Sequence, residues 1–145
     1  MPTRTAHTTW TGGLQDGTGT VTLVSSGLGS YEISFPKRAA DDADGTTSPE
    51  ELIAAAHAGC FAMQFSALLD RAGGSSQSID VDADVTLGPD PAGGFRISGI
   101  KLTVSGSAAG VSPDDFAKIA ADAKANCPVS KALAGTTITL DVAAS

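Results

Sequence analysis

Alternating apolar and polar positions in the first third of the chain predict β-strands. In "YEISF" (residues 31–35), apolar side chains at 31, 33 and 35 alternate with polar ones, the period-two pattern of a half-buried strand. The threonine-rich segments 5–10 and 17–27 precede it, separated by a glycine turn at 12–13, and Pro36 ends the third strand. We therefore expect three antiparallel strands joined by tight turns.

One long helix is predicted next, over "SPEELIAAAHAGCFAMQFSALLDRAGG" (48–74). Ser48 is a suitable N-cap, Pro49 takes the first helical position, and Glu51 completes a capping box, while the glycines at 73–74 end the helix. Its surface is apolar almost all round, and its alanines would let another backbone approach closely. Such a helix is expected to be buried, and a partner subunit is a natural way to cover it.

The second half of the chain predicts two strands, a helix and a last strand. Residues 78–87 alternate regularly, whereas the alternation in 95–106 slips by one residue, which predicts a β-bulge or bend near Gly99. A helix follows over residues 112–127, with "VSKAL" (129–133) as a further turn, and "TTITLDV" (136–142) forms the last strand. The order predicts an α+β fold with an antiparallel sheet, in a single domain spanning residues 1–145.

The charge and composition exclude several classes of protein. The net charge is −7, with 16 acidic and 9 basic residues, so no nucleic-acid partner is expected. We find no uninterrupted run of the roughly 18 apolar residues that a membrane span needs, and no apolar segment of a secretory signal at the start, so we expect a cytoplasmic protein without a membrane partner. The spacing of two cysteines and two histidines fits no zinc pattern, so no metal is expected.

The long helix carries the candidate chemistry. At about 100° per residue, Glu50, His57, Cys60 and Gln64 share one of its faces. A carboxylate, an imidazole and a thiol on one face can present a reactive cysteine, but the same face can equally be a helix edge that meets solvent. Glu51 has a structural task in the capping box, which leaves Glu50 the freer acid for function.

Each of the two cysteines has an inert and a reactive interpretation. Cys60 lies in mid-helix, where a reactive thiolate needs a cation from elsewhere, and Arg38, just past the third strand, is a candidate. Cys127 precedes Pro128 and would therefore be the N-cap of the next short turn, where backbone N–H groups favour a thiolate. Alternatively, both cysteines are small buried residues, and Arg38 is a solvated strand end.

Two segments resemble a known family. "GTTSPEELIAAAHAGCFAM" (45–63) and "KANCPVSKAL" (124–133), together with the ending "ITLDV", are similar to the OsmC branch of the OsmC/Ohr family of organic hydroperoxide peroxidases. The resemblance extends over nearly the full chain. It implies an OsmC-like fold in which an antiparallel sheet wraps a long central helix, within an intertwined homodimer whose active sites lie at the subunit interface.

The resemblance also implies an activity and the residues that perform it. The family reduces organic hydroperoxides, and hydrogen peroxide less well, in oxidative and osmotic stress defence. By this resemblance Cys60 is the peroxidatic cysteine, Cys127 the resolving cysteine, Arg38 the group that stabilises thiolate and peroxide, and Glu50 the carboxylate that orients Arg38. No cofactor is implied, because an external dithiol or a lipoylated protein restores the thiols.

Two other functions compete with a peroxidase. His57 precedes Cys60 by three residues, within side-chain reach on a helix, as a cysteine–histidine acyl hydrolase would need. A hydrolase has no use for Cys127. A non-catalytic dimeric protein, structural or binding a small ligand, would leave both thiols inert.

Overall fold

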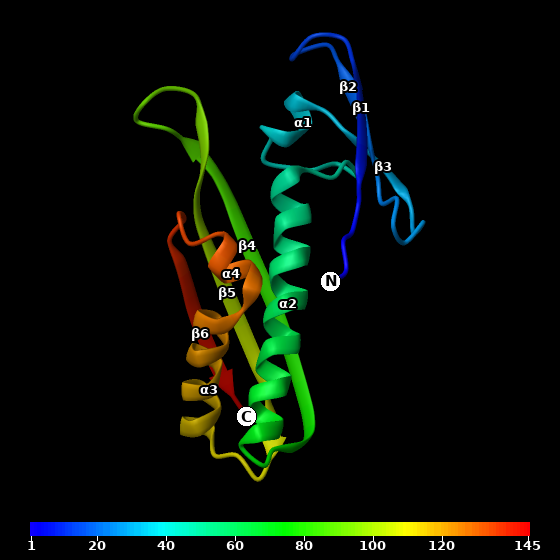
Figure 1. Cartoon of the computed structure of the whole chain (residues 1–145). Helices are drawn as coiled ribbons and strands as arrows, with labels where there is room; N and C mark the ends of the chain where they lie inside the picture. Colours follow the sequence, from blue (N-terminus) through cyan, green and yellow to red (C-terminus); the bar gives the residue numbers. More distant parts are fainter. The chain divides into compact units, whose positions relative to one another are not determined.

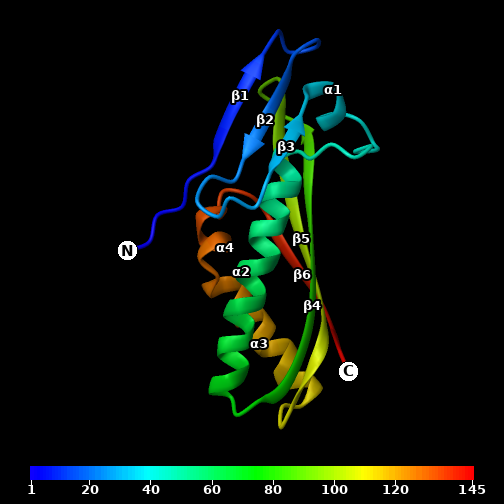
Figure 2. The ribbon, with the colours of Figure 1, turned by 90° about the vertical axis from the view of Figure 1, so that its right-hand side faces the viewer.

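The computed structural model describes residues 1–145, and the chain divides into two compact units, Met1–Leu52 and Ile53–Ser145. Along the chain come three strands, a long helix, two strands, a helix and a last strand, with two additional short helices (Figures 1 and 2). The predicted α+β class and order of the main elements are confirmed.

The first unit contains a three-stranded antiparallel sheet. Strands β1 (His7–Thr11), β2 (Thr18–Thr22) and β3 (Ser30–Ile33) pair in that order, as predicted. Helix α1 (Phe35–Arg38) was not predicted. Pro36 occupies its first turn, and the Ser34 side chain accepts a hydrogen bond from the Lys37 N–H. The proline thus starts a helical turn directly after the strand, and this turn ends at Arg38.

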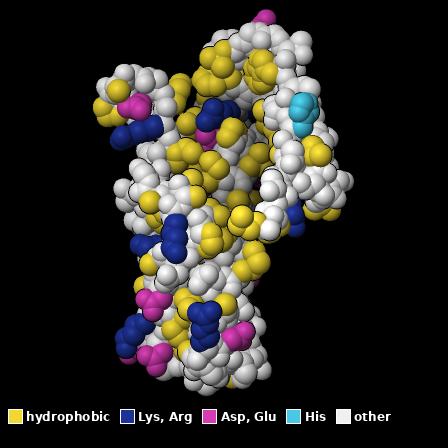
Figure 3. All heavy atoms as spheres, in the orientation of Figure 1, with side chains coloured by type: hydrophobic (Ala, Val, Ile, Leu, Met, Phe, Trp, Pro, Cys, Tyr) yellow, Lys and Arg dark blue, Asp and Glu magenta, His cyan; other side chains and the backbone are white.

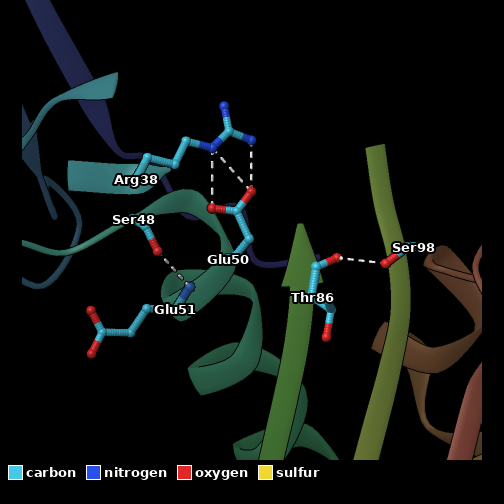
Figure 4. Close-up of polar contacts among 6 residues, drawn as sticks. All are labelled: Arg38, Ser48, Glu50, Glu51, Thr86 and Ser98. Carbon is cyan, nitrogen blue, oxygen red and sulfur yellow. Dashed lines mark hydrogen bonds and ion pairs between the residues drawn. The ribbon is translucent and has the colours of Figure 1, made fainter. Parts of the chain in front are cut away.

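Helix α2 (Pro49–Arg71) begins in the first unit and continues through the second. The predicted cap is present, because the Ser48 hydroxyl accepts the Glu51 N–H at 3.2 Å (Figure 4). In the second unit, fully buried side chains recur every four residues on one face of the helix, and Met63 on another face is 71% exposed. Burial all round was predicted, and the structure confirms it for one face only. The buried side chains are His57, Phe61, Phe65 and Leu69.

By length and composition alone, α2 could also cross a membrane, since an 18-residue window has a mean hydropathy of 1.6. Glycine and polar residues interrupt the apolar positions of this window, so it does not form the uninterrupted apolar run that was expected of a membrane span. Of that window 22% is buried, and Phe61, Phe65 and Leu69 on this helix pack into the core of the second unit.

The sheet of the second unit contains β4 (Ser75–Pro89), β5 (Phe95–Ala109) and β6 (Ile138–Ala144), in that order. The predicted irregularity near Gly99 is confirmed. Thr86 pairs with Gly99 while Leu87 pairs with Ile97, so Ser98 is the extra residue of a bulge. The Ser98 hydroxyl donates to the Thr86 carbonyl at 3.4 Å (Figure 4).

The last strand corrects one prediction. Strands β4 and β5 are antiparallel, but β6 runs parallel to β5. The connection between them passes through helix α3 (Pro113–Asn126) and helix α4 (Pro128–Ala132). A crossover of this length can return the chain in the same direction, which a tight turn cannot do. The crossover also places Cys127 between the two helices.

Three phenylalanines form the centre of the core in the second unit. The ring of Phe65 lies 5.6 Å from that of Phe61 and 4.8 Å from that of Phe116, the latter edge to face. These distances are in the range of favourable aromatic pairs. The core therefore holds α2 against α3. This contact sets the position of Cys60, on α2, relative to Cys127, which follows α3.

We expect Phe65→Ala to destabilise the protein by about 3–5 kcal/mol, because it leaves a cavity among the three rings. Urea unfolding followed by circular dichroism measures this change. Leu28→Ala is the control, because Leu28 is 79% exposed and its truncation should change the free energy of unfolding by about 0.5 kcal/mol or less. Equal effects of the two substitutions would contradict the assigned core.

Candidate active site

The structure brings the two cysteines together, although 67 residues separate them in the sequence. Cys60 lies on α2, and Cys127 is the N-cap of α4, as predicted. Both are free thiols, and their sulfurs are 3.0 Å apart. Cys127 is fully buried, whereas Cys60 is half-buried and reaches the surface of the unit. The pair is therefore close enough for thiol–disulfide chemistry, with Cys60 the more accessible sulfur.

The surroundings affect the two thiols in opposite ways. Burial raises the pKa of Cys60, as does the neighbouring Cys127, and only the Val129 N–H lowers it. Burial also acts to raise the pKa of Cys127, but hydrogen bonds from Cys60 and Ser130 outweigh it, so its pKa lies below the ordinary value. Within this unit the hydrogen bonds therefore favour the thiolate at Cys127, and burial disfavours it at Cys60. For Cys60 to act as a thiolate, a cation must be brought to it.

His57 is fully buried and binds Ser130 rather than Cys60. Its Nε2 lies 2.7 Å from the Ser130 hydroxyl, and its Nδ1 has no hydrogen-bond partner. Burial lowers the pKa of His57, which keeps the ring neutral at physiological pH. This arrangement does not make His57 the base of Cys60, as the hydrolase alternative requires. No cluster of three or more histidine, cysteine or acidic side chains is placed to share a metal ion.

Ser130 was missed by the sequence analysis. It follows Cys127 by three residues, the spacing that also separates His57 from Cys60. Residues three apart on a helical turn lie side by side. This repeated spacing was the available signal, but only the packing of α4 on α2 shows that the two pairs face each other.

In the first unit, Arg38 and Glu50 form the predicted pair. The Arg38 Nε lies 3.1 Å from both carboxylate oxygens of Glu50, and its Nη2 lies 2.6 Å from Oε1 (Figure 4). Glu50 is 7% exposed. Its burial raises its pKa, but the hydrogen bonds and charge of Arg38 outweigh this and lower it below the ordinary 4.5. The forked contact fixes the guanidinium plane and leaves one of its nitrogens, Nη1, free of the carboxylate.

A mostly apolar pocket of about 230 Å³ adjoins Arg38 in the first unit. Such a pocket suits an apolar group attached to a polar head that the guanidinium can bind. Its lining residues are Trp10, Leu14, Ile33, Ser34, Phe35, Arg38 and Pro49.

The Arg38–Glu50 pair should make stability depend on pH. Because the folded-state pKa of Glu50 is lowered, its contribution is present above pH 4.5 and is lost as the pH falls through the folded-state value. We therefore expect the stability difference between wild type and Glu50→Gln to shrink on acidification below pH 4.5. Urea unfolding between pH 7 and pH 3 measures it, with Glu51→Gln, whose carboxylate does not contact Arg38, as the control. A difference that stays constant across this range would contradict the assigned ion pair.

Comparisons with known proteins agree with these features. The family model described as OsmC-like protein matches residues 41–142. "Peroxiredoxin OsmC" of Escherichia coli (strain K12) is 42% identical over 132 residues, covering 91% of this chain and 90% of the relative. Among solved structures, the organic hydroperoxide resistance protein OhrB of Bacillus subtilis is 26% identical with a TM-score of 0.71, covering 96% and 98% of the two chains. An organic hydroperoxide resistance protein from Elizabethkingia anophelis is 28% identical with a TM-score of 0.71, covering 97% and 96%. These matches and the paired cysteines confirm the predicted family: the chain belongs to the OsmC family.

Proposed function

We propose that this protein is a thiol-dependent peroxidase that reduces organic hydroperoxides by a two-cysteine cycle. The observation that carries the proposal is the 3.0 Å separation of the Cys60 and Cys127 sulfurs in a member of the OsmC family. The names of the relatives support it, since they include a peroxiredoxin and organic hydroperoxide resistance proteins. The acyl hydrolase and inert-thiol alternatives have no comparable support.

In the first step Cys60 is the nucleophile. Its thiolate attacks one peroxide oxygen, and the O–O bond breaks with its electron pair on the other oxygen, which takes up a proton and leaves as an alcohol. Cys60 is thereby oxidised to a sulfenic acid. Arg38 supplies the cation that keeps Cys60 ionised and stabilises the departing alkoxide, while Glu50 orients Arg38.

In the second step Cys127 resolves the sulfenic acid. Its thiolate attacks the Cys60 sulfur, the S–S bond forms, and the displaced hydroxide takes up a proton to become water. An external thiol reductant then supplies two electrons and two protons to restore both thiols. A dithiol or a lipoylated protein meets this need, because its second thiol completes the reduction within the same complex. The cycle requires no prosthetic group.

The pocket beside Arg38 supports a preference for organic hydroperoxides over hydrogen peroxide. Its apolar lining would contact an alkyl or aryl group, with the peroxide oxygens directed to the guanidinium. Hydrogen peroxide has no such group and gains nothing from the pocket. A role in defence against oxidative stress follows from such an activity, and a role in osmotic stress is proposed from the family resemblance alone.

The exposed apolar surface of α2 supports a homodimer. Hydrophobic side chains reach the molecular surface (Figure 3). On α2, Met63 is 71% exposed. A second subunit that packs on this helix would cover this side chain. We take residues 1–145 to form one domain that is completed in the dimer, with the active site at the subunit interface and the protein in the cytoplasm.

Mass spectrometry of the reduced protein, before and after one equivalent of cumene hydroperoxide, tests the cycle. We expect the loss of two hydrogens and a cross-linked peptide that joins Cys60 to Cys127. Cumyl alcohol should appear in equal amount, and hydrogen peroxide should react more slowly. If both thiols remain free and alkylatable, the peroxidase proposal is wrong and the inert-thiol alternative gains.

A further inference from the structure

Four side chains in the second unit form a closed arrangement that the cycle described above uses only in part. His57 and Cys60 are neighbours on α2, and Cys127 and Ser130 are neighbours on the turn that begins α4. The two pairs meet twice, since the sulfurs are 3.0 Å apart and the His57 Nε2 is 2.7 Å from the Ser130 hydroxyl. His57, Cys127 and Ser130 are all buried. The Ser130 hydroxyl therefore lies between the buried imidazole of His57 and the turn that carries the resolving Cys127.

The hydrogen bonds in this arrangement have one favoured direction. The ring of His57 is neutral and carries one proton. At Nε2 that proton has an acceptor in Ser130, whereas at Nδ1 it would be buried without a partner. The Nε2–H therefore donates to the Ser130 oxygen, and the Ser130 hydroxyl is left to donate in turn. Cys127 is the N-cap of α4 and lies three residues before Ser130 on the same turn, and the Ser130 side chain is one of the groups that lower its pKa.

We propose that His57 and Ser130 form a hydrogen-bond relay that holds Cys127 as a thiolate for the resolving step. The inference rests on the proposed two-cysteine cycle and adds two positioning residues to it. The Ser130 hydroxyl donates to the Cys127 sulfur, and the imidazole polarises that hydroxyl and fixes its rotamer. Neither residue takes part in the bond changes, in which the Cys127 sulfur bonds to the Cys60 sulfur and hydroxide leaves.

The relay should affect the two steps differently. Attack on the peroxide uses the Cys60 thiolate and depends on the cation brought to it. Formation of the disulfide depends on the fraction of Cys127 that is ionised. Loss of the relay therefore prolongs the lifetime of the Cys60 sulfenic acid, and a second peroxide molecule can then oxidise it to sulfinic acid. The relay would thus protect the enzyme against inactivation by its own substrate.

The test is rapid-quench mass spectrometry of the full chain at pH 7, after one equivalent of cumene hydroperoxide. In Ser130→Ala we expect disulfide formation to slow by roughly fivefold, while the first step is not slowed. The loss of one hydrogen bond to a charged sulfur reduces the thiolate fraction about tenfold or more, and the greater nucleophilicity of the less acidic thiolate recovers part of the rate. Excess peroxide should produce more sulfinic acid at Cys60 than in the wild type.

Two variants of His57 separate the relay from simple packing. His57→Leu should slow the second step less than Ser130→Ala, because the hydroxyl remains but is no longer oriented. His57→Gln retains an N–H near the position of Nε2 and should restore most of the rate. Lys131→Ala, an exposed neighbour of Ser130 on α4, is the control that should change neither step. Melting temperatures check that each variant is folded.

A second measurement follows the iodoacetamide reactivity of Cys127 against pH in a Cys60→Ser background. Cys60 is the titratable group in contact with Cys127, and His57 acts on Cys127 through Ser130. This background therefore removes the neighbouring thiol and leaves the relay together with the backbone N–H groups of Val129 and Ser130, which Ser130→Ala retains. Ser130→Ala should move the midpoint to higher pH. The relay is wrong if the midpoint does not move, or if both steps of the cycle slow equally. If the wild type leaves cumene hydroperoxide intact, the proposed function is wrong. The pH midpoint of Cys127 alkylation would still show whether Ser130 stabilises the Cys127 thiolate.

Discussion

Cys60→Ser is expected to abolish peroxidase activity, with a fall in kcat/KM of at least about 10³-fold. A serine hydroxyl is not ionised at neutral pH and is a far weaker nucleophile toward a peroxide oxygen than a thiolate. Cys127 cannot replace Cys60, because it is fully buried. Cumene hydroperoxide consumption with dithiothreitol as reductant measures the loss.

Cys127→Ser provides the comparison with this variant. It should still reduce about one equivalent of peroxide per chain in a single turnover, because the first step needs only Cys60. Further peroxide should then accumulate sulfinic acid at Cys60, seen as a mass gain of two oxygens. If Cys60→Ser retained activity while Cys127→Ser lost the first turnover, the two roles would have to be exchanged.

Arg38→Met should lower kcat/KM for cumene hydroperoxide by about 10²-fold or more. Burial and Cys127 both raise the pKa of Cys60, and only a backbone N–H opposes them within its unit. A guanidinium brought to the thiol would reverse this and also stabilise the departing alkoxide. The pH profile supplies the second readout, because the rate of Arg38→Met should rise with pH over the range in which the Cys60 thiol ionises.

Arg38→Lys and Lys37→Met are the comparison variants for Arg38→Met. Lysine keeps the charge but not the planar fork that contacts both Glu50 oxygens, so we expect an intermediate rate. Lys37 is the adjacent cation and pairs with Asp44 at the surface, so Lys37→Met should keep the wild-type rate. An equal loss in the Lys37 and Arg38 variants would indicate general attraction of the peroxide, not a specific catalytic arginine.

Local signals in the sequence determined most of the secondary structure. The Ser48 cap of α2 and the bulge near Gly99 follow from interactions between residues close in the chain or from a change of phase, and both are present. Helix α1 was missed because Pro36 stops a strand and starts a helix equally well. The predicted antiparallel pairing of β6 was wrong, because no local pattern in the sequence distinguishes a parallel from an antiparallel neighbouring strand.

The sequence by itself determined the family, the fold class and the residue types of the candidate site. Cap signals, periodicity and the two cysteine motifs are properties of short segments, so they can be interpreted without coordinates. The tertiary structure alone decided that Cys127 lies against Cys60 and that His57 binds Ser130. Those contacts depend on how α4 packs against α2, which is set by burial of the phenylalanine core. Burial brings together residues that are far apart in the chain, so the contacts that it produces cannot be predicted from any short segment of the sequence.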